Sequence, residues 1–454
     1  MKHLPLALLL LLLVRFTPAG FASEVEILCT TDIHGRAEAL IRLAPILRKN
    51  PDALRIDCGD TMQGTLLSRH SDGQIMTALL NELRYDVWIP GNHDFEFGPE
   101  ALIRAAREFR GKTLGAEFQR TGFKPSAWVL FERNGHRVAV IGMTDPKMPN
   151  RLLPDSGWTF QANRDALREI MPELLAAKPD LIVLAWHAGL YTPPGTMFRF
   201  LAEFPEIDLV LAGHSHEEKR GFRVAGAWFV QAGRYAQCVA RIRARFDDDT
   251  GELERITSEL LRPEEDSPGD AEAEQVLRPF LERYKPYAET VIATTKEPLR
   301  LPEKRENTAP ICRIGAEAVH RAAGSDAALF SVSALPQFEI PCTVTNEGLF
   351  TLLPYENELC TVELTREELA ELLTWLGAAN RRGRSVFAFS GLNVVQNGKR
   401  WSAPGAPERL TLALSTYSLT STPLLREKLD SGAYKLTGIT ERDAVAAYLK
   451  RRFR

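Results

Sequence analysis

The chain has 454 residues, of which 44% are hydrophobic and 25% charged, a composition that excludes a disordered or low-complexity protein. Its 56 basic and 59 acidic residues give a formal net charge of −3, so it has no excess of positive charge for binding nucleic acid polymers or an anionic membrane surface. The near-neutral charge favours small soluble partners. A chain of this length is too long for one hydrophobic core, which predicts two domains.

The N-terminus has the pattern of a secretory signal peptide. Lys2 precedes an apolar run over residues 4–14, and the small residues Gly20 and Ala22 follow at the spacing of a cleavage site. No later run reaches the roughly 20 apolar residues that a transmembrane anchor needs. The sequence therefore predicts a signal peptide over residues 1–22 and an exported protein, periplasmic or extracellular, without a transmembrane anchor.

Six cysteines are present, without paired spacing and without a CxxC motif, which argues against a structural zinc site. Three of them lie inside apolar runs and are expected to be buried thiols. A disulfide bridge stays open among the other three, Cys312, Cys342 and Cys360.

Short β-rich runs alternate with helical patterns from Val25 to about residue 262, beginning VEILCTTD, ALIRLAPILRK, ALRIDCGD and QIMTALLNELR. This alternation predicts an α/β layered domain. Two strands flank the dipeptide Asn134-Gly135, a strong hairpin signal, so the sheet region is not expected to be purely parallel.

A segment rich in proline, glycine and acidic residues, LLRPEEDSPGDAEAEQ, then interrupts the alternation, and helical periodicity follows it. We place a linker helix at 263–295, between a catalytic domain at 23–262 and a second, smaller α/β domain at 296–454.

Polar side chains follow several of the predicted strands. His214 and His216 come directly after the apolar run LVLAG, where an unpaired imidazole nitrogen would cost about 1 to 3 kcal/mol. Because side chains two apart on an extended backbone point the same way, we expect both imidazoles to converge on one point. Other strand ends supply Asp32, His34, Asp60, Asn92, His93 and His187. Loops that leave one edge of an α/β sheet meet over it, so these residues are predicted to share one site.

Carboxylate, carboxamide and imidazole ligands without thiolate suit divalent ions such as zinc, manganese, iron or cobalt. Seven ligands exceed one tetrahedral site, which predicts two metals about 3.5 to 4 Å apart, a clamp that serves phosphoester hydrolysis. Taken singly, each motif has a plainer explanation, because Gly-Asp and Gly-Asn are common turns and Asp32 or Asp60 would cap a helix. Five such motifs in one domain favour the shared site.

The motifs DIHG, GDTMQG, GNHDFEFG, WHAG and GHSH, in this order, resemble those of the calcineurin-like metallophosphoesterases. QAGRYAQCVARIRARF, LLPYENEL and ITERDAVAAYLK are similar to segments of the 5′-nucleotidase branch, so the resemblance covers nearly the whole mature chain. It implies a layered α/β/β/α sandwich followed by a smaller α/β domain that binds the substrate.

The resemblance also implies the role of each site residue. One metal would be held by Asp32, His34, Asp60 and His216, and the other by Asp60, Asn92, His187 and His214, with Asp60 bridging. His93 would stabilise the transition state or protonate the leaving oxygen. The family usually reads GNHEFD where this chain reads GNHDFE, so Glu96 takes the place of the carboxylate that orients His93, and Asp94 is the second candidate. The alternative is that both are a solvated acidic turn and His93 acts unaided.

The second domain departs from the family pattern. The resemblance implies a substrate-binding arginine in an NGGIR-like turn, but the matching segment, SVSALPQ, has Pro336 there, and proline offers an anion no donor. Of the two rings that would sandwich a base, Tyr417 stands at the second position, and Phe387 or Phe389 lies near the first. Core packing is the alternative for each ring.

A basic loop, with Arg381, Arg382 and Arg384, would supply the missing positive charge or else form a solvated surface.

These observations predict an exported two-metal phosphohydrolase that cleaves a phosphate monoester, a nucleotide or a related ester. The alternatives are a phosphodiesterase or pyrophosphatase acting on cyclic nucleotides or UDP-sugars and, more distantly, a thiosulfate-ester hydrolase. A binding protein on a phosphoesterase scaffold is the non-enzyme alternative, against which the complete ligand set argues, because such buried polar groups are costly without their metals. The sequence leaves metal identity, domain motion and oligomeric state open.

Overall fold

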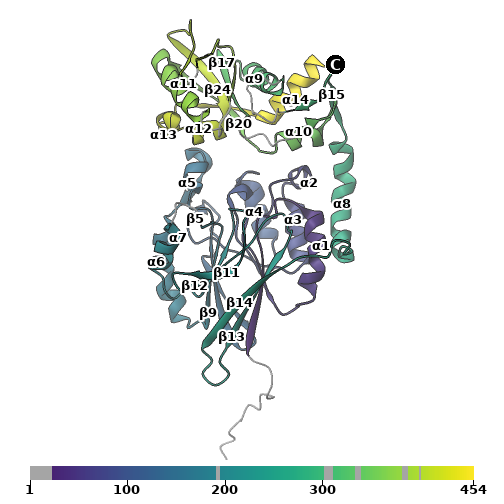
Figure 1. Ribbon diagram of the computed structural model, residues 1–454, viewed down its shortest axis with the longest axis vertical. Coiled ribbons are helices and arrows are strands. Elements are labelled where there is room, and N and C mark those ends of the chain that lie inside the picture. The colour runs from purple at the N-terminus through teal and green to yellow at the C-terminus, as the bar shows by residue number, and fades with distance from the viewer. Residues whose placement is uncertain are drawn as a thin grey trace, which may run out of the picture.

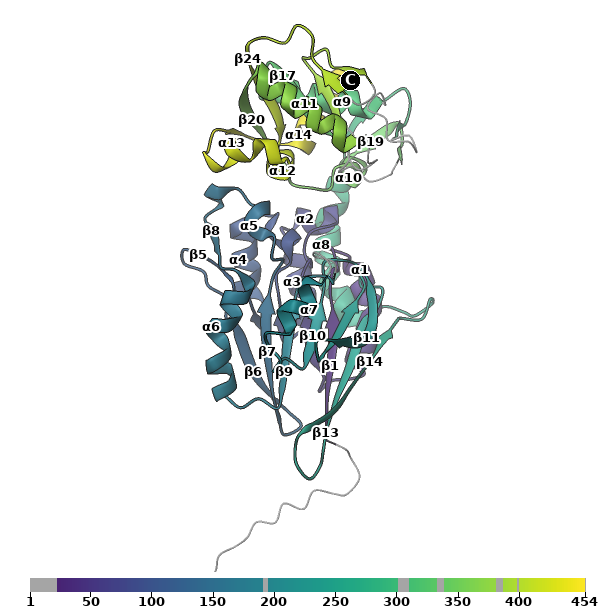
Figure 2. The same cartoon turned by 60° about the vertical axis from the view of Figure 1, so that its left-hand side comes forward.

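The computed structural model describes residues 23–190, 195–300, 310–332, 339–380, 387–397 and 400–453. The predicted signal peptide, Pro336 and the basic loop with Arg381, Arg382 and Arg384 lie outside the described residues. Figures 1 and 2 show two domains joined along one side by the long helix α8 (Ala271–Ala288).

Two six-stranded sheets form the N-terminal domain. The first has the order β14 (Leu253–Leu261), β13 (Val239–Phe246), β1 (Glu24–Thr30), β2 (Leu54–Asp57), β3 (Val87–Trp88) and β4 (Lys112–Thr113). The second has the order β11 (Glu218–Val224), β12 (Ala227–Ala232), β10 (Leu209–Ala212), β9 (Leu181–Trp186), β7 (His136–Met143) and β6 (Trp128–Arg133).

The two sheets pack face to face through one apolar core. Ile27 and Ile56 from the first sheet share this core with Val183 and Leu211 from the second. The alternation of side chains along a strand then sends Leu28 to the opposite face, where it packs against helices.

Helices cover the outer face of each sheet. The first sheet is covered by α1 (Ala37–Arg48), α3 (Gln74–Glu82) and α8, and the second by α6 (Asn163–Ala176) and α7 (Thr196–Leu201). The predicted α/β/β/α sandwich is confirmed.

The sheets are mixed, as the sequence predicted. Strands β1 to β4 run parallel, whereas β6 and β7 form an antiparallel hairpin. Its turn is Asn134-Gly135, with φ of 51° and 84°, the positive values that a two-residue hairpin loop requires.

The second domain is built on a five-stranded sheet with helices on both faces. The strands, in order, are β21 (Phe387–Ser390), β17 (Ala327–Ser331), β24 (Arg409–Ser415), β20 (Glu358–Thr365) and β25 (Lys435–Thr440). Helices α9 (Pro310–Ala323) and α14 (Glu441–Arg452) pack on one face and α11 (Arg366–Asn380) on the other.

Shorter elements complete the chain. The helices are α2 (Leu66–His70), α4 (Pro99–Glu108), α5 (Met148–Arg151), α10 (Asn346–Leu352), α12 (Thr416–Ser421) and α13 (Arg426–Asp430). The strands are β5 (Phe118–Arg120), β8 (Trp158–Phe160), β15 (Val291–Thr294), β16 (Leu299–Arg300), β18 (Glu339–Ile340), β19 (Thr343–Thr345), β22 (Val395–Asn397) and β23 (Arg400–Ser402).

Polar contacts link the two domains near α2. The Glu356 carboxylate, from the second domain, lies 3.0 Å from Nε of Arg69 and also pairs with Arg442 of its own domain. The Gln63 side-chain amide donates to the carbonyl of Pro354 at 3.0 Å. These contacts place the segment around residues 354–356 against the loop that follows β2.

The cysteines form no disulfide bridge among the described residues, so the question that the sequence left open is answered there. Cys58 and Cys360 are buried thiols, and Cys342 is half-buried. Within the part of the chain that the structure describes, no helix is both long and apolar enough to cross a membrane.

Candidate metal centre

The residues predicted to bind metals follow strands of both sheets. They lie after β1 (Asp32, His34), β2 (Asp60), β3 (Asn92), β9 (His187) and β10 (His214, His216). These strands end at one edge of the sandwich, and the loops beyond them bring the six carboxylate and imidazole side chains into two adjoining groups.

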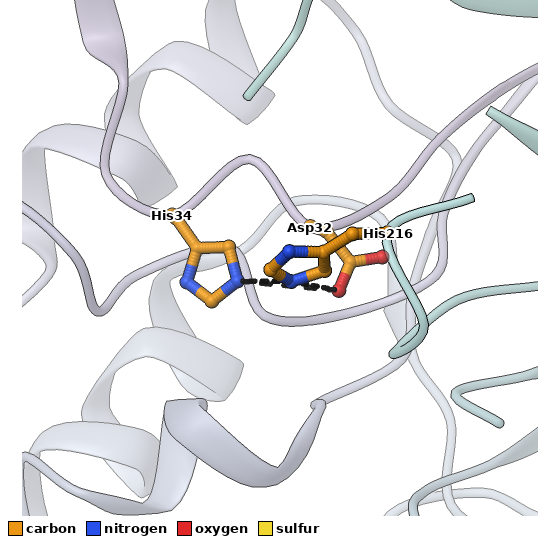
Figure 3. A group of neighbouring side chains, drawn as sticks. All are labelled: Asp32, His34 and His216. Atoms are coloured by element: carbon orange, nitrogen blue, oxygen red, sulfur yellow. Dashed lines mark hydrogen bonds and ion pairs between the residues drawn. The ribbon is translucent and has the colours of Figure 1, made fainter. Parts of the chain in front are cut away.

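The first group consists of Asp32 and His34, from the loop after β1, and His216, from the loop after β10, which reach toward one another (Figure 3). Nε2 of His34 lies 3.0 Å from Nε2 of His216, which in turn lies 3.3 Å from Oδ1 of Asp32. The second imidazole nitrogen of His34, Nδ1, pairs with the carbonyl of Gln63 at 3.0 Å. That bond fixes the ring so that the Nε2 lone pair points into the group, as a metal ligand requires.

The second group consists of Asp60, His187 and His214. Nε2 of His187 lies 3.1 Å from Oδ2 of Asp60, while its Nδ1 donates to the carbonyl of Cys58 at 2.6 Å. The same Asp60 oxygen is 3.8 Å from Nε2 of His34. Asp60 therefore lies between the two groups, where a bridging carboxylate is predicted.

Unsatisfied buried atoms test whether these residues fit metal ions. Among the described residues, Oδ1 of Asn92 is buried without a hydrogen-bond partner, and Nε2 of His187 is buried facing the Asp60 carboxylate at 3.1 Å. Orphaned polar atoms of this kind are costly in a folded protein unless a ligand satisfies them. Together with a donor set of carboxylate, carboxamide and imidazole, they fit a pair of divalent cations.

Left-handed backbone conformation is concentrated in these loops. The φ angles are 52° for Asp32, 51° for His34, 53° for Asp60, 71° for His214 and 59° for His216. Such conformations cost roughly 1 to 3 kcal/mol each for residues other than glycine and cluster at functional sites. A Cβ atom at Gly91 would lie 2.3 Å from Oδ1 of Asp60, so this position needs glycine.

This geometry corrects one expectation. His214 and His216 lie beyond the end of β10, on left-handed backbone rather than on an extended strand. The prediction that their imidazoles converge on one point is wrong, because His216 joins Asp32 and His34 while His214 joins Asp60 and His187.

The charge state of the second group is set by Asp60. Burial by itself disfavours charge on Asp60, but His187 and His93 hold the pKa of this carboxyl well below its usual range. Burial likewise disfavours the His187 cation, but Asp60 outweighs it and raises the pKa of His187 to about 10. A divalent cation would take the place of this proton.

Burial dominates for two other imidazoles. It lowers the pKa of His34 to about 4 and, with the help of His187, that of His214 to about 4. Both rings are neutral at physiological pH and have a lone pair for a metal.

His93 stands beside the two groups, paired with Glu96. Its backbone N–H donates to Oδ1 of Asp60 at 2.7 Å, and its Nδ1 forms a hydrogen bond with Oε1 of Glu96. Burial opposes protonation of the ring, but Glu96 and Asp60 outweigh burial and raise the pKa of His93 to about 9. Its ring centroid lies 5.4 Å from that of His34. His93 is thus a protonated imidazole held against the candidate metal ligands.

Asp94, the second candidate for orienting His93, has a different environment. It is fully buried, and its carboxylate accepts hydrogen bonds from the backbone N–H groups of Thr61, Met62 and Gly91 at 2.7 to 2.9 Å. Asp94 therefore ties together the loops that carry Asp60 and Asn92. A solvated acidic turn does not describe this segment.

Three further residues lie at the site without belonging to a metal-ligand motif. Tyr355, within the quoted LLPYENEL segment, stacks on His93 with ring centroids 6.0 Å apart. Tyr235 lies edge-on to both His34 and His216, with centroids 5.7 and 5.9 Å away. Arg151 ends α5, and its Nη2 lies 3.4 Å from Nε2 of His214. Each reaches the site from a segment that follows no metal-ligand motif.

The aromatic residues predicted to bind a base differ in accessibility. Tyr417, on α12, is 48% exposed. The pKa of the Tyr355 hydroxyl is raised mainly by burial and by the Glu96 charge, and the nearby Tyr417 adds to this effect. Phe387 is only 6% exposed because β21 turns it into the second domain's core, so it is not accessible for stacking on a base. Phe389 is half-buried, edge-on to Trp401. Packing, the alternative left open for Phe387, describes its position.

Residues 25–218 match the calcineurin-like phosphoesterase family, and residues 291–409 match the 5′-nucleotidase C-terminal domain. The chain belongs to the calcineurin-like phosphoesterases, the class that its layered fold and its two groups of metal-type ligands define. The second match places it, more narrowly, in the 5′-nucleotidase family.

The 5′-nucleotidase of Vibrio vulnificus is 23% identical over 409 residues, 78% of this chain and 73% of that protein. The human 5′-nucleotidase is 26% identical over 242 residues, 47% of this chain but only 41% of the human protein. The crystal structure of a 5′-nucleotidase precursor from Thermus thermophilus has the same fold, with 20% identity, a TM-score of 0.71, and coverage of 94% of this chain and 96% of that one.

Proposed function

We propose that this protein is a two-metal phosphohydrolase that releases phosphate from a monoester, with nucleotides as the leading substrate class. One observation carries the proposal: two buried ligand groups meet at Asp60, beside the His93–Glu96 pair. The Vibrio vulnificus and human relatives, both named 5′-nucleotidase, support the choice of nucleotides.

The ligand roles follow the two groups. One ion would be held by Asp32, His34 and His216. The other ion would be held by His187, His214 and Asn92, and Asp60 would bind both. Two divalent ions supply an electrostatic clamp for the charge that develops on the attacking and leaving oxygens. Zinc, manganese, iron and cobalt all suit these ligands.

His93 would supply the proton that the leaving group needs. When water adds to phosphorus and the ester P–O bond breaks, the leaving oxygen must take up a proton. Glu96 occupies Nδ1 of His93, which leaves Nε2–H as the donor, and the pKa of about 9 keeps that proton in place at neutral pH. Glu96 therefore acts through His93, by orienting it.

The second domain would recognise the organic part of the substrate. Tyr355, which stacks on His93, and the exposed Tyr417 near it would supply rings on which a base stacks. Tyr417 keeps the role that the resemblance implies for it, and Tyr355 would take the place of the buried Phe387, while the half-buried Phe389 stays a candidate.

We further propose that residues 1–22 are a signal peptide, so that the protein acts outside the cytoplasm, in the periplasm or beyond the cell. The proposed boundaries are 23–262 for the catalytic domain, 263–295 for the linker and 296–454 for the substrate domain. Helix α8 and its flanking residues lie within the proposed linker.

The test is phosphate release by the purified mature protein, with manganese, zinc or EDTA present. The substrates are nucleoside monophosphates, cyclic nucleotides, UDP-glucose and a generic aryl phosphate. Metal-dependent hydrolysis of nucleoside monophosphates well ahead of the aryl ester is the expected result. A preference for cyclic nucleotides or UDP-glucose would replace the monoesterase by the diesterase or pyrophosphatase alternative. A metal-loaded protein that cleaves nothing would favour a binding protein.

A further inference from the structure

Arg151 lies at the candidate metal centre, although no metal-ligand motif contains it. Its Nη2 atom is 3.4 Å from Nε2 of His214. The guanidinium therefore lies directly beside the second ligand group.

One edge of this guanidinium is fixed by the protein. Its Nε lies 2.7 Å from Oδ2 of Asp145, a carboxylate whose side chain is 2% exposed and whose Oδ1 accepts from the backbone N–H of Lys147. The Arg151 side chain itself is 38% exposed. A planar guanidinium held through Nε, with Nη2 also against His214, keeps further Nη hydrogens for another acceptor, and such forks match the oxygens of phosphate.

The charges around Arg151 also favour the binding of an anion. Asp145 compensates its charge, but two divalent cations in the neighbouring ligand groups would repel the guanidinium. A phosphate group between the ions and Arg151 would convert that repulsion into attraction on both sides.

The position of α5 fits the same role. This helix packs against α12, which carries Tyr417, and Asn150 pairs with Arg426 of α13 at 3.4 Å. Figures 1 and 2 both show α5 at the end of the first domain that faces these two helices. Helix α5, which ends at Arg151, thus contacts both the candidate metal ligand His214 and the helix that carries Tyr417.

We propose that Arg151 binds the phosphate group of the substrate, through hydrogen bonds from its Nη atoms to non-bridging oxygens. This inference rests on the proposed function, and it places a phosphate-binding arginine in the catalytic domain. The family resemblance implies a substrate-binding arginine in the second domain instead. This chain has Pro336 at that position, and proline offers an anion no donor.

The test compares Arg151→Met and Arg151→Lys with the unaltered protein, all loaded with manganese. Calorimetry gives the affinity for inorganic phosphate, mass spectrometry gives the bound metal, and steady-state kinetics give KM and kcat for a nucleoside monophosphate. Arg168→Met is the matched control, because Arg168 is also paired with a carboxylate, that of Glu203, but lies on the outer helix α6.

Arg151→Met is expected to weaken phosphate binding roughly 10- to 100-fold, the effect of losing hydrogen bonds to a charged group, with two metals retained. Arg151→Lys, which keeps the charge but loses the fork, should show an intermediate loss, and Arg168→Met should bind phosphate normally.

Unchanged phosphate affinity in Arg151→Met would overturn the inference. Loss of bound metal in both Arg151 variants would overturn it too, because it would make Arg151 a positioning residue for His214. If the unaltered protein cleaves no ester but binds phosphate, and Arg151→Met loses that binding, the proposed function is refuted. The proposed role of Arg151 then still holds.

Discussion

The ring of Tyr355, from the second domain, is stacked on the imidazole of His93, from the first, with centroids 6.0 Å apart and planes inclined by 23°. Nδ1 of His93 forms a hydrogen bond with Glu96, and its ring lies beside that of the candidate ligand His34. A side chain of the substrate domain therefore contacts the candidate proton donor directly.

Replacing Tyr355 by leucine should lower kcat/KM for a nucleoside monophosphate roughly 2- to 10-fold, because a stacking aromatic contact is worth about 0.5 to 1.5 kcal/mol beyond its area. Tyr355→Phe keeps the ring and should retain most of the activity. Tyr287→Leu is the control, since Tyr287 also stacks on a histidine, His70, at the end of α8. Equal losses for Tyr355→Leu and Tyr287→Leu would mean that the effect comes from general destabilisation.

Removing the charge of Glu96 should lower kcat about 10- to 100-fold for Glu96→Gln, because His93 then loses the charge that raises its pKa and keeps only a weaker, neutral hydrogen-bond partner. Asp94→Asn should act differently. It weakens an acceptor of three backbone N–H groups, so the main loss should be in the unfolding midpoint. Rates and thermal melts of the two variants check this, and a normal rate for Glu96→Gln would remove Glu96 from the proposed pair.

Metal content should report the two ligand groups separately. The unaltered protein is expected to keep two divalent ions after dialysis into metal-free buffer, whereas His216→Ala and His214→Ala should each keep one or fewer. His70→Ala, a histidine outside both groups, should keep two. Excess EDTA should lower the unfolding midpoint, since bound ions stabilise the folded state. Two ions retained by both ligand variants, measured by mass spectrometry, would contradict the assignment.

Glu117 should make stability depend on pH. Burial raises the pKa of this carboxyl to about 7, against about 4.5 when it is exposed. Below pH 4.5 it is neutral in both states, and as pH rises toward 7 only the unfolded state releases the proton freely, so the free energy of unfolding falls. Glu117→Gln lacks this fall and should gain roughly 3 kcal/mol on the unaltered protein between pH 4.5 and 8.

Denaturant unfolding of both forms at the two pH values measures this difference. Glu132→Gln, at an exposed position of β6, controls for removing a carboxylate as such. A difference between the Glu117 forms that does not change with pH would show that Glu117 is ionised in its buried position.

Much of this site could be predicted from sequence because its ligands follow strands. An apolar run that ends in Asp, Asn or His is a local pattern, and parallel strands bring such ends to one edge whatever the rest of the chain does. The hairpin at Asn134-Gly135 was predictable for the same reason, since its φ angles are a property of the two residues themselves.

Other features depend on neighbours that are distant in the chain. His214 and His216 separate into different groups because the loop after β10 is left-handed, which the alternation rule for strands did not anticipate. Asp94 and Glu96 are two residues apart and chemically alike. The buried Asp94 accepts hydrogen bonds from the backbone N–H groups of Thr61, Met62 and Gly91, whereas Glu96 pairs with His93.

By itself, the sequence determined the layered fold and the ligand types, because strand periodicity and side-chain chemistry are local properties. Only the tertiary structure decided which residues meet. Tyr355 reaches His93 across the domain boundary, and Arg151 reaches His214 from a four-residue helix. Phe387 turns into a core instead of a pocket. Contacts of this kind depend on how whole domains and loops pack, for which no short stretch of sequence carries a signal.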